Sequence, residues 1–466
     1  MDSESPLRKS FWFGTIDPRP LALFRIGFGF VLLFDALKRT TDFRAFLTDD
    51  GILPRGVLRD PSRYSAFDLF GSTTGVAALY AVGVAAIIAF LVGYRTRVAT
   101  VVCWLFFVSL YNRNPYVSDG GDDVARALLL FCAFTDLGAW WSIDARRIGR
   151  PLTKVPSFPL RVLQLYVAID YFIPGYLKLK GGWLGGTRVY ESLQLLGMVR
   201  PPGVWLGSSP MLCGLVTYAT LVIELGFPLL AFAPILTRPL RATAIALFAS
   251  LQLGIILTMR VGIWTELMLW TCVPFLLPEW IEWAENAIRR RFKLPPAPQA
   301  MPVPAGRGAS PGRRFAYLLL SIQFFVFAMS QINATSRRLP AIMRREMALI
   351  SLHGGLSPFS VVGNIEQWHA TGTLTDGRIV EMLPVAAPGL ESKVQFGFSR
   401  WYKFTFKDGI HFPELALYLC RIYDERAQTA PLERFTLEKD VHPALLPGQA
   451  APPDTHVVLW SGRCGE

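Results

Sequence analysis

Long apolar runs recur along the first two thirds of this chain, and they constrain its fold more than any other feature. A helix needs about 20 mostly apolar residues to cross the hydrocarbon core of a bilayer. About nine such runs can be marked, at residues 20–38, 74–94, 97–111, 124–142, 159–178, 212–234, 240–259, 262–279 and 315–333. The sequence therefore predicts an α-helical polytopic membrane protein, with the lipid bilayer as its first partner.

The charge of the chain agrees with a membrane location. Only 18% of the residues are charged, compared with about 25% in soluble proteins. The formal net charge of +12 would suit a nucleic-acid-binding protein, but apolar runs interrupt every basic cluster, so we expect no nucleic-acid partner. Lys and Arg gather in the segments on the N-terminal side of alternate spans, and the positive-inside rule places those segments in the cytoplasm. We therefore expect a protein of the cell (inner) membrane with a cytoplasmic N-terminus.

The chain consists of two regions that differ in composition. Residues 1–333 hold the spans and a Pro-, Ala- and Gly-rich stretch, 294–312, which is typical of a flexible cytoplasmic linker. Residues 334–466 alternate apolar and polar residues around turn signals such as Asp376-Gly377 and Asp408-Gly409, a pattern typical of β-hairpins. We expect a small β-rich domain there, on the periplasmic or extracellular side.

Within this second region the alternating runs 394–398 and 401–406 predict strands, and 413–423 predicts a helix. Cys420 and Cys464 both lie here, and an oxidising compartment would allow them to form a disulfide. The alternative is two free thiols.

Several ionisable residues interrupt the predicted spans. Charged groups are costly inside a bilayer and are functional candidates there. The residues concerned are Arg25, Asp35, Arg126, Asp136, Asp170, Lys178, Glu224 and Glu266. The alternative is that they pair with one another and fix helix packing, for example Arg25 with Glu224 or with Asp170.

Lys178 closes the fifth predicted span, within the segment Tyr171–Gly186 (YFIPGYLKLKGGWLGG). Pro174 and Gly175, one turn earlier, are expected to interrupt the helix. One interpretation is that Lys178 simply extends to the membrane surface. The other is that the break holds it in a dry pocket, with Trp183 as a substrate-binding candidate. Burial there would disfavour the charged ammonium and make the neutral amine available as a base.

The segment 111–126, between the third and fourth predicted spans, concentrates charge around a Gly-Gly pair. Its substrate-binding candidates are Arg113, Asp119, Asp122, Asp123 and Arg126. The acids would suit the N-terminus of the fourth span as caps, or they would face a polar substrate beside Lys178. Their spacing is not that of an EF-hand, and all five His lie after residue 334. We therefore predict no metal site.

Four parts of the chain, in order, resemble the HTTM domain, which vitamin K-dependent γ-glutamyl carboxylase shares with many bacterial proteins. They are Pro20–Gly29 (PLALFRIGFG), Gly93–Arg97 (GYRTR), Tyr111–Asp122 (YNRNPYVSDGGD) and Trp141–Asp144 (WSID). The resemblance covers roughly residues 20–280. The segment Tyr171–Gly186 is similar to the carboxylase segment that carries the catalytic lysine. The resemblance thus implies Lys178 as the catalytic residue, with Lys180 as the near alternative.

The resemblance also implies a function. The carboxylase uses reduced vitamin K, oxygen and carbon dioxide, and its lysine starts the oxygenation of the quinol. By resemblance we expect a quinol-linked, lysine-base enzyme of carbon–carbon lyase or ligase type, with an outward-facing site. Its cofactor would be reduced vitamin K or another quinol, and a peptide would be a further partner. A functional His of the carboxylase has no counterpart in the membrane part, so carboxylation of protein glutamates is not implied.

Two other functions stay open at this point. One is a non-catalytic membrane scaffold or binding protein whose outer domain contacts another envelope protein. The other is a transporter, which the charges inside the spans would allow.

Overall fold

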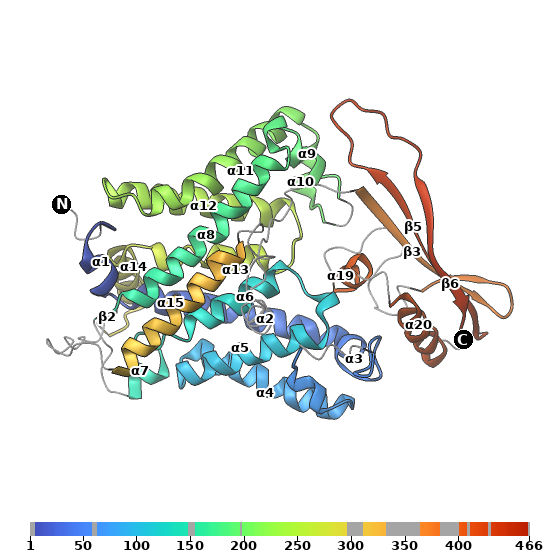
Figure 1. Ribbon diagram of the computed structural model, residues 1–466, viewed down its shortest axis with the longest axis horizontal. Helices are drawn as coiled ribbons and strands as arrows, with labels where there is room; N and C mark the ends of the chain where they lie inside the picture. The colour runs from blue at the N-terminus through green and yellow to red at the C-terminus, as the bar shows by residue number, and fades with distance from the viewer. Residues whose placement is uncertain are drawn as a thin grey trace.

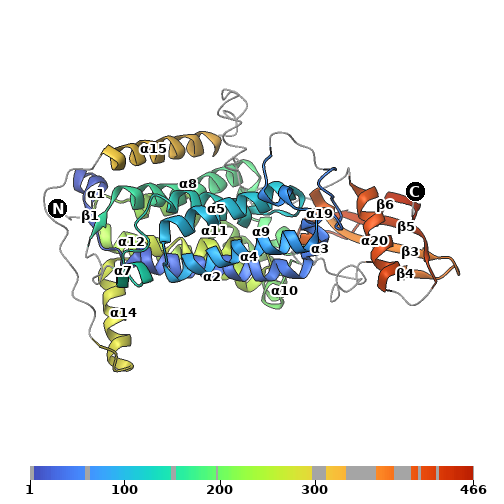
Figure 2. The same cartoon turned by 90° about the horizontal axis from the view of Figure 1, so that it is seen from below.

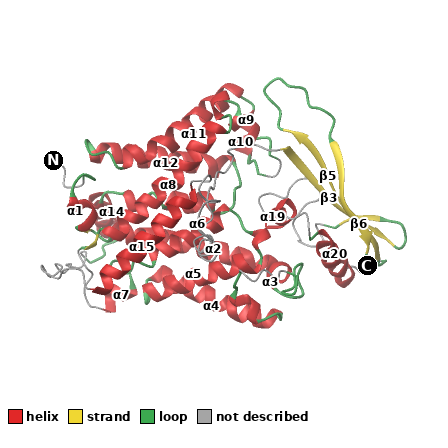
Figure 3. Ribbon diagram, in the orientation of Figure 1, coloured by secondary structure: helices red, strands yellow, loops and turns green. Residues whose placement is uncertain are grey.

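The structure is a computed structural model that describes residues 5–57, 63–147, 154–195, 198–295, 311–331, 364–382, 400–407, 411–426 and 430–464. A bundle of long helices fills one part of the molecule, and a small sheet lies beyond one end of that bundle (Figures 1 and 3). The linker 294–312, apart from its first two and last two residues, and the predicted strand 394–398 lie outside the described residues.

In the described part of the chain, five helical stretches are long and apolar enough to cross a membrane. They are Arg19–Leu47, which joins α2 (Arg19–Arg39), η1 (Thr40–Asp42) and α3 (Phe43–Leu47), and then α4 (Thr73–Val92), α11 (Pro210–Ala231), α12 (Thr237–Thr258) and α15 (Pro311–Gln331). The chain is therefore an integral membrane protein. Two further long helices, α5 (Thr96–Arg113) and α8 (Phe158–Lys180), cover the predicted spans 97–111 and 159–178.

Two predicted spans are wrong as single helices, so nine spans are not supported by the described residues. The span 124–142 is helical only as far as Cys132, where α6 (Gly120–Cys132) ends. The span 262–279 is broken into α13 (Trp264–Trp270), η5 (Val273–Phe275) and the start of α14 (Pro278–Arg291). Pro274 and Pro278 explain the second break, because proline lacks the N–H that a continuing helix needs.

Close contact between helix backbones and aromatic rings holds the bundle together. A Cβ built on Gly27 of α2 would lie 2.1 Å from the ring of Trp270, so this indole packs directly on the α2 backbone. Phe24 and Phe28 of α2 and Phe90 of α4 are fully buried in the same core. Lipid tails are as apolar as these rings, so close packing rather than exclusion of water stabilises the contact.

The two ends of the bundle differ. The short helices α1 (Lys9–Phe13) and α7 (Ile143–Arg147), together with α14, gather at the end remote from the sheet (Figure 2). All three contain basic residues of the segments that the sequence assigns to the cytoplasm. The predicted inner segments therefore lie at one end of the molecule, and the sheet lies beyond the other.

The C-terminal sheet has the strand order β4-β3-β5-β6, and each neighbouring pair is antiparallel. The strands are β3 (Asn364–Leu374), β4 (Ile379–Glu381), β5 (Leu432–Pro443) and β6 (Thr455–Arg463). The predicted Asp-Gly hairpin joins β3 to β4, and Gly377 has a φ of 83°, in the left-handed region that favours glycine. The expectation of a small C-terminal β-sheet region is confirmed.

A helix packs against this sheet. The helix α20 (Phe412–Arg426) covers the stretch 413–423 that was predicted to be helical, and it shares a buried apolar core with Phe435 of β5. A disulfide joins Cys420 of α20 to Cys464, just after β6. The helix and the edge strand are therefore tied covalently.

The predicted strand 401–406 is wrong, because these residues belong to the helix α19 (Arg400–Lys407). Trp401 and Phe404 are both buried and, being three residues apart, lie on one face of that helix. So short an apolar run fits the period of a helix as well as that of a strand, and tertiary packing decides which of the two forms.

Candidate functional site

The last turns of α8 carry Lys178. Pro174 lies inside α8, but the helix continues to Lys180, so the predicted interruption at Pro174 and Gly175 is wrong. Neighbouring helices can compensate for a proline inside a span. Gly175 has a different consequence: a Cβ there would lie 2.9 Å from the Cβ of Glu224. Glycine therefore lets α11 approach α8 closely at this level.

Lys178 and Glu224 form an ion pair between α8 and α11, in which Nζ donates to Oε1. Each side chain is only 5% exposed. The Nζ of Lys178 also lies 4.7 Å from the centre of the Trp183 ring, which is a cation–π distance. Oε2 of Glu224 is buried and has no hydrogen-bond partner among the described residues. The pair therefore leaves one buried carboxylate oxygen without a hydrogen bond in the described part of the chain.

This ion pair lies on the wall of a cavity of about 310 Å³. The cavity is lined by Lys178, Trp183, Val189, Ser192, Leu193, Leu206, Val216, Ala219, Thr220, Ile223, Glu224, Ser250, Leu251, Gly254, Ile255, Thr258, Met259 and Trp264. Most of these side chains are apolar, and a few polar groups converge among them. Both the volume and this mixture are typical of small-molecule sites.

Lys180, the alternative catalytic candidate, lies elsewhere. Its side chain is exposed and is not part of the cavity lining, and its Nζ is 4.6 Å from the centre of the Tyr176 ring. The structure thus brings Lys178, Trp183 and Glu224 together and leaves Lys180 outside.

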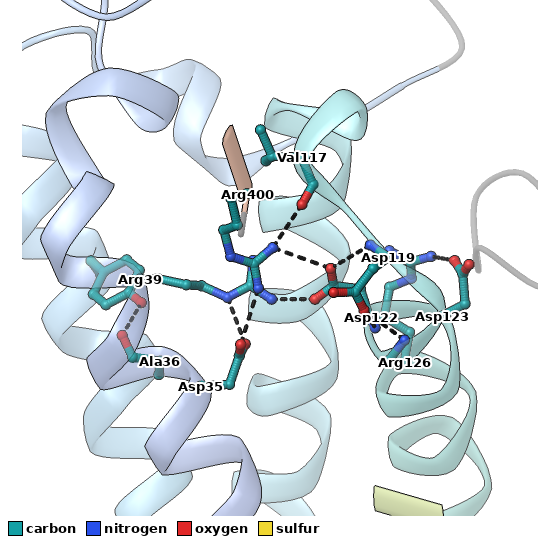
Figure 4. Close-up of polar contacts among 11 residues, drawn as sticks. Asp35, Ala36, Arg39, Val117, Asp119, Asp122, Asp123, Arg126 and Arg400 are labelled. Carbon is teal, nitrogen blue, oxygen red and sulfur yellow. Dashed lines mark hydrogen bonds and ion pairs between the residues drawn. The ribbon is translucent and has the colours of Figure 1, made fainter. Parts of the chain in front are cut away.

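The acids of the segment 111–126 form a separate polar cluster, shown in Figure 4. Asp119 is the N-cap of α6, and its Oδ1 accepts a hydrogen bond from the N–H of Gly121 at 2.7 Å. Asp122 accepts from the N–H of Asp119 at 2.9 Å, which completes a capping box. None of the substrate-binding candidates of this segment lines the cavity. Burial, reinforced by the charge of Asp122, raises the pKa of Asp119 to about 6.

Asp122 also belongs to a closed ring of four charges, which we call the charge ring: Asp35, Arg39, Asp122 and Arg400. Asp122 pairs with Arg39 of α2 and, at 3.3 Å, with Arg400 of α19. Asp35 pairs with the same two arginines, at 2.6 Å and 3.0 Å (Figure 4). The ring therefore links the sheet region to two helices of the bundle.

The other members of the segment have their own partners. Arg113 donates to the backbone carbonyls of Leu47 and Leu53, at 3.1 Å and 2.9 Å. Arg126 pairs with Asp123, one turn earlier in the same helix. These contacts hold the segment in place at a distance from the cavity lining.

The remaining charged candidates also lie outside the cavity lining. Arg25 donates to the carbonyls of Leu137 and Trp141, at 2.8 Å and 2.6 Å, so its predicted pairing with Glu224 or Asp170 is wrong. Asp170 is buried within α8. Two further residues contact protein groups: Glu266 accepts from Thr265, and Asp136 pairs with Arg97.

A family model for the HTTM domain matches residues 13–280, which is more than half of the chain. The chain belongs to the HTTM family. The matched range contains every residue that lines the cavity, so the cavity lies within the HTTM domain, whereas α15 and the sheet follow it. No solved structure matches the chain.

Two contacts between the sheet region and the bundle of this HTTM protein carry no signal in the sequence. Gln194 donates to the carbonyl of Leu445 at 2.8 Å and accepts from the N–H of the same residue at 2.9 Å. Leu193, its neighbour in the chain, lines the cavity, so the loop between β5 and β6 contacts a residue that is adjacent in sequence to the cavity lining. The other contact is that of Arg400 with Asp35, which lie 365 positions apart.

In the parts of the HTTM protein that the structure describes, no group of three or more His, Cys, Asp or Glu side chains is arranged to hold a metal ion.

Proposed function

We propose that this HTTM protein is a carboxylase-like membrane enzyme in which Lys178 acts as a base on a quinol, reduced vitamin K or a similar molecule, bound in the cavity. The observation that supports this best is the buried Lys178–Glu224 pair on the wall of an apolar cavity of about 310 Å³. A quinol with an apolar tail needs an apolar cavity and polar groups at one point of its wall. The residues present fit that description.

Glu224 would set the protonation state of Lys178. The two groups share a hydrogen bond, so a proton can pass from the ammonium to the carboxylate within the pair. The mostly apolar walls of the cavity favour this exchange, because an apolar environment disfavours a pair of charges relative to two neutral groups. The neutral amine is then a competent base. A bound quinol would supply an acidic hydroxyl and the electrons, and the face of Trp183 would orient an aromatic ring beside the amine.

The cavity suits a substrate that arrives through the membrane. Its walls include residues of α11 and α12, which are both candidate spans. We further propose that the N-terminus is cytoplasmic and that the sheet region faces the periplasm or the exterior, since the basic helices α1, α7 and α14 lie at the opposite end. The cavity would then open toward the outer side of the cell membrane.

Turnover of reduced vitamin K by the purified protein in lipid nanodiscs, followed as oxygen uptake and loss of quinol, tests the proposal. Lys178→Ala should lower the rate by about 10²–10⁴-fold, the usual contribution of a general base. Lys180→Ala removes an exposed lysine two positions away and is the matched control, so its rate should stay unchanged. Wild-type protein that turns over no quinol, or Lys178→Ala protein with the wild-type rate, would refute the proposal.

A second candidate function is a binding protein for another envelope protein or peptide. The observation that favours it is the attachment of the sheet region to the bundle through several contacts, among them those of Arg400 and Gln194. A sheet held in this way presents a fixed surface. Photo-crosslinking from β6 followed by mass spectrometry would identify a partner. Capture of the same partner by Lys178→Ala protein, without quinol turnover by wild type, would favour this function over catalysis.

A further inference from the structure

The helix α14 takes no part in the cavity, yet its position is well defined. It lies at the end of the bundle remote from the sheet and runs across the bundle rather than along it (Figure 2). Glu285, whose side chain is 5% exposed, accepts from Nε1 of Trp141 at 3.1 Å and pairs with Arg19 at 3.2 Å. These buried contacts fix α14 in the orientation of a helix that lies in the plane of a membrane surface.

One face of α14 is apolar and exposed. Trp280, Ala284 and Ala287 follow one another at spacings of four and three residues, so they form a single stripe. Trp283 and Ile288 flank this stripe and are 70% and 53% exposed. Tryptophan side chains favour the boundary between lipid headgroups and acyl chains. The exposed face therefore has the chemistry of a membrane interface.

The same face borders a groove of about 530 Å³ between α14 and the start of α2. Apolar side chains make up most of its lining, among them Leu23, Trp141, Leu276, Ala284 and Ile288. The two charged residues of the lining, Glu285 and Arg289, form an ion pair of 2.9 Å, and Glu285 also pairs with Arg19. The groove is therefore suited to an acyl chain.

Two arginines follow the groove at the end of the helix. Arg290 and Arg291 are both exposed, and no described residue forms an ion pair with either of them. Arg291 lies four residues after Ala287 and seven after Ala284, so it continues the apolar stripe. Two exposed guanidinium groups without an ion-pair partner among the described residues thus follow directly after Arg289, which lines the groove.

We propose that α14 and this groove bind an anionic phospholipid, with one acyl chain in the groove and the phosphate at Arg290 and Arg291. Guanidinium groups bind phosphate through charge-assisted hydrogen bonds, and basic residues at a membrane surface attract anionic lipid. A soluble phosphate compound would use the arginines but would leave the groove empty. A second copy of the chain would cover the apolar face but would leave the arginines without an anion. A phospholipid would fill the groove with an acyl chain and would also supply an anion to the arginines.

Native mass spectrometry of the full-length protein, titrated with phosphatidylglycerol or with phosphatidylcholine of the same acyl chains, tests the proposal. The wild-type protein should retain phosphatidylglycerol more tightly. Arg290→Gln/Arg291→Gln should weaken that retention by roughly 30-fold, since each basic residue near anionic lipid contributes about fivefold, and should leave retention of phosphatidylcholine unchanged. Arg434→Gln/Arg463→Gln, which removes two exposed arginines from the sheet, is the matched control and should change neither.

A second variant tests the groove itself. Ala284→Trp fills the groove and keeps both arginines, so retention of phosphatidylglycerol should fall while the thermal unfolding temperature is maintained. Equal retention of the two lipids by wild type, or an equal loss in the control pair, would overturn the proposal. Displacement of the bound lipid by soluble glycerol phosphate, or a dimer that Trp283→Ala abolishes, would overturn it too, in favour of a soluble ligand or a second copy.

Discussion

Arg400 of α19 donates to the carboxylate of Asp35 in α2 at 3.0 Å, although 365 positions separate the two residues in the chain. Asp122 and Arg39 complete the charge ring around this contact. A buried group of charges is favourable only while each member keeps its partners. The ring is therefore the place where attachment of the sheet region to the bundle can be tested most directly.

Removal of one member of the ring should release α19. Arg400→Ala leaves Asp35 and Asp122 with Arg39 as their shared cation, and loss of one partner from a buried ion pair costs about 3–5 kcal/mol. Hydrogen exchange in α19 should become faster. Arg378→Ala is the control, because Arg378 pairs with Asp376 on the exposed hairpin, and such exposed pairs contribute about 1 kcal/mol or less. Unchanged exchange in α19 of the Arg400→Ala protein would contradict the role of the ring.

Gly175 should be needed for the close approach of α8 and α11. In Gly175→Ala protein the new Cβ would lie 2.9 Å from the Cβ of Glu224, so the helices must separate, at a cost of about 1–3 kcal/mol for overpacking. Gly226→Ala in α11 is the matched control, since a Cβ there meets nothing within 4 Å. Thermal unfolding in nanodiscs measures the stability of both variants. The prediction fails if the two variants unfold at the same temperature.

Glu224 should be required for the base chemistry proposed for Lys178. Glu224→Gln keeps the shape of the side chain and an oxygen that accepts a hydrogen bond, but it removes the carboxylate that can take the proton. Quinol turnover should fall by about 10²-fold or more, while the protein stays folded. Glu266→Gln changes a carboxylate outside the cavity lining and should keep the wild-type rate. Equal rates for the two variants would count against the proton transfer.

The disulfide should stabilise the sheet region. Cys420 and Cys464 are 44 positions apart, and closing a loop of that length contributes about 3–4 kcal/mol in the chain-entropy account. Cys420→Ser/Cys464→Ser should make the sheet region more sensitive to protease, and wild-type protein should show the same change after reduction. Cys213→Ser, at a free buried cysteine of α11, is the control. If neither reduction nor the double substitution changed the protease sensitivity of the sheet region, a stabilising role of the disulfide would be ruled out.

The sheet should respond to pH through one pair of side chains. The hydrogen bond between His456 and Asp440 raises the pKa of His456 above its ordinary 6.5 and lowers the pKa of Asp440 below its ordinary 3.8. The histidine contributes stability below pH 6.5 that is lost as pH rises through its folded pKa. The aspartate contributes stability above pH 3.8 that is lost as pH falls through its own. Both contributions are therefore present between these two values.

Replacement of the aspartate gives the measurement. In Asp440→Asn protein the pKa of His456, followed by NMR of protein labelled at histidine, should return toward 6.5. Asp376→Asn alters an aspartate in the β3–β4 turn and should leave the titration of His456 as it is in wild type. A His456 that titrates identically in the Asp440→Asn protein would disprove the coupling.

The long helices could be predicted from the sequence because the bilayer imposes their length and composition. Each of α2, α4, α11, α12 and α15 belongs to a helical stretch that is long enough and apolar enough to cross a bilayer. The run 262–279 is also rich in apolar residues, but Pro274 and Pro278 divide it, and a count of apolar residues does not detect such a break. The strand predicted at 401–406 failed for a related reason: its apolar residues fit both a helix and a strand.

Only part of the candidate site could be predicted from the sequence. Lys178 could be singled out because a lysine inside a predicted span is unusual. Its partner could not, since Glu224 lies 46 positions away and meets Lys178 only because Gly175 lets two helices come together. The partners of Arg25 could not be predicted for a different reason. They are backbone carbonyls, and because every residue has one, no side chain in the sequence marks them as partners.

The position of Arg400 in the chain has a consequence for the order of synthesis. Asp35, Arg39 and Asp122 are translated long before Arg400, and together they carry one excess negative charge. A nascent chain that ends before residue 400 therefore holds an uncompensated carboxylate among its assembled helices. The ribosome must deliver α19, which lies in the last seventh of the polypeptide, before Arg400 can neutralise that carboxylate.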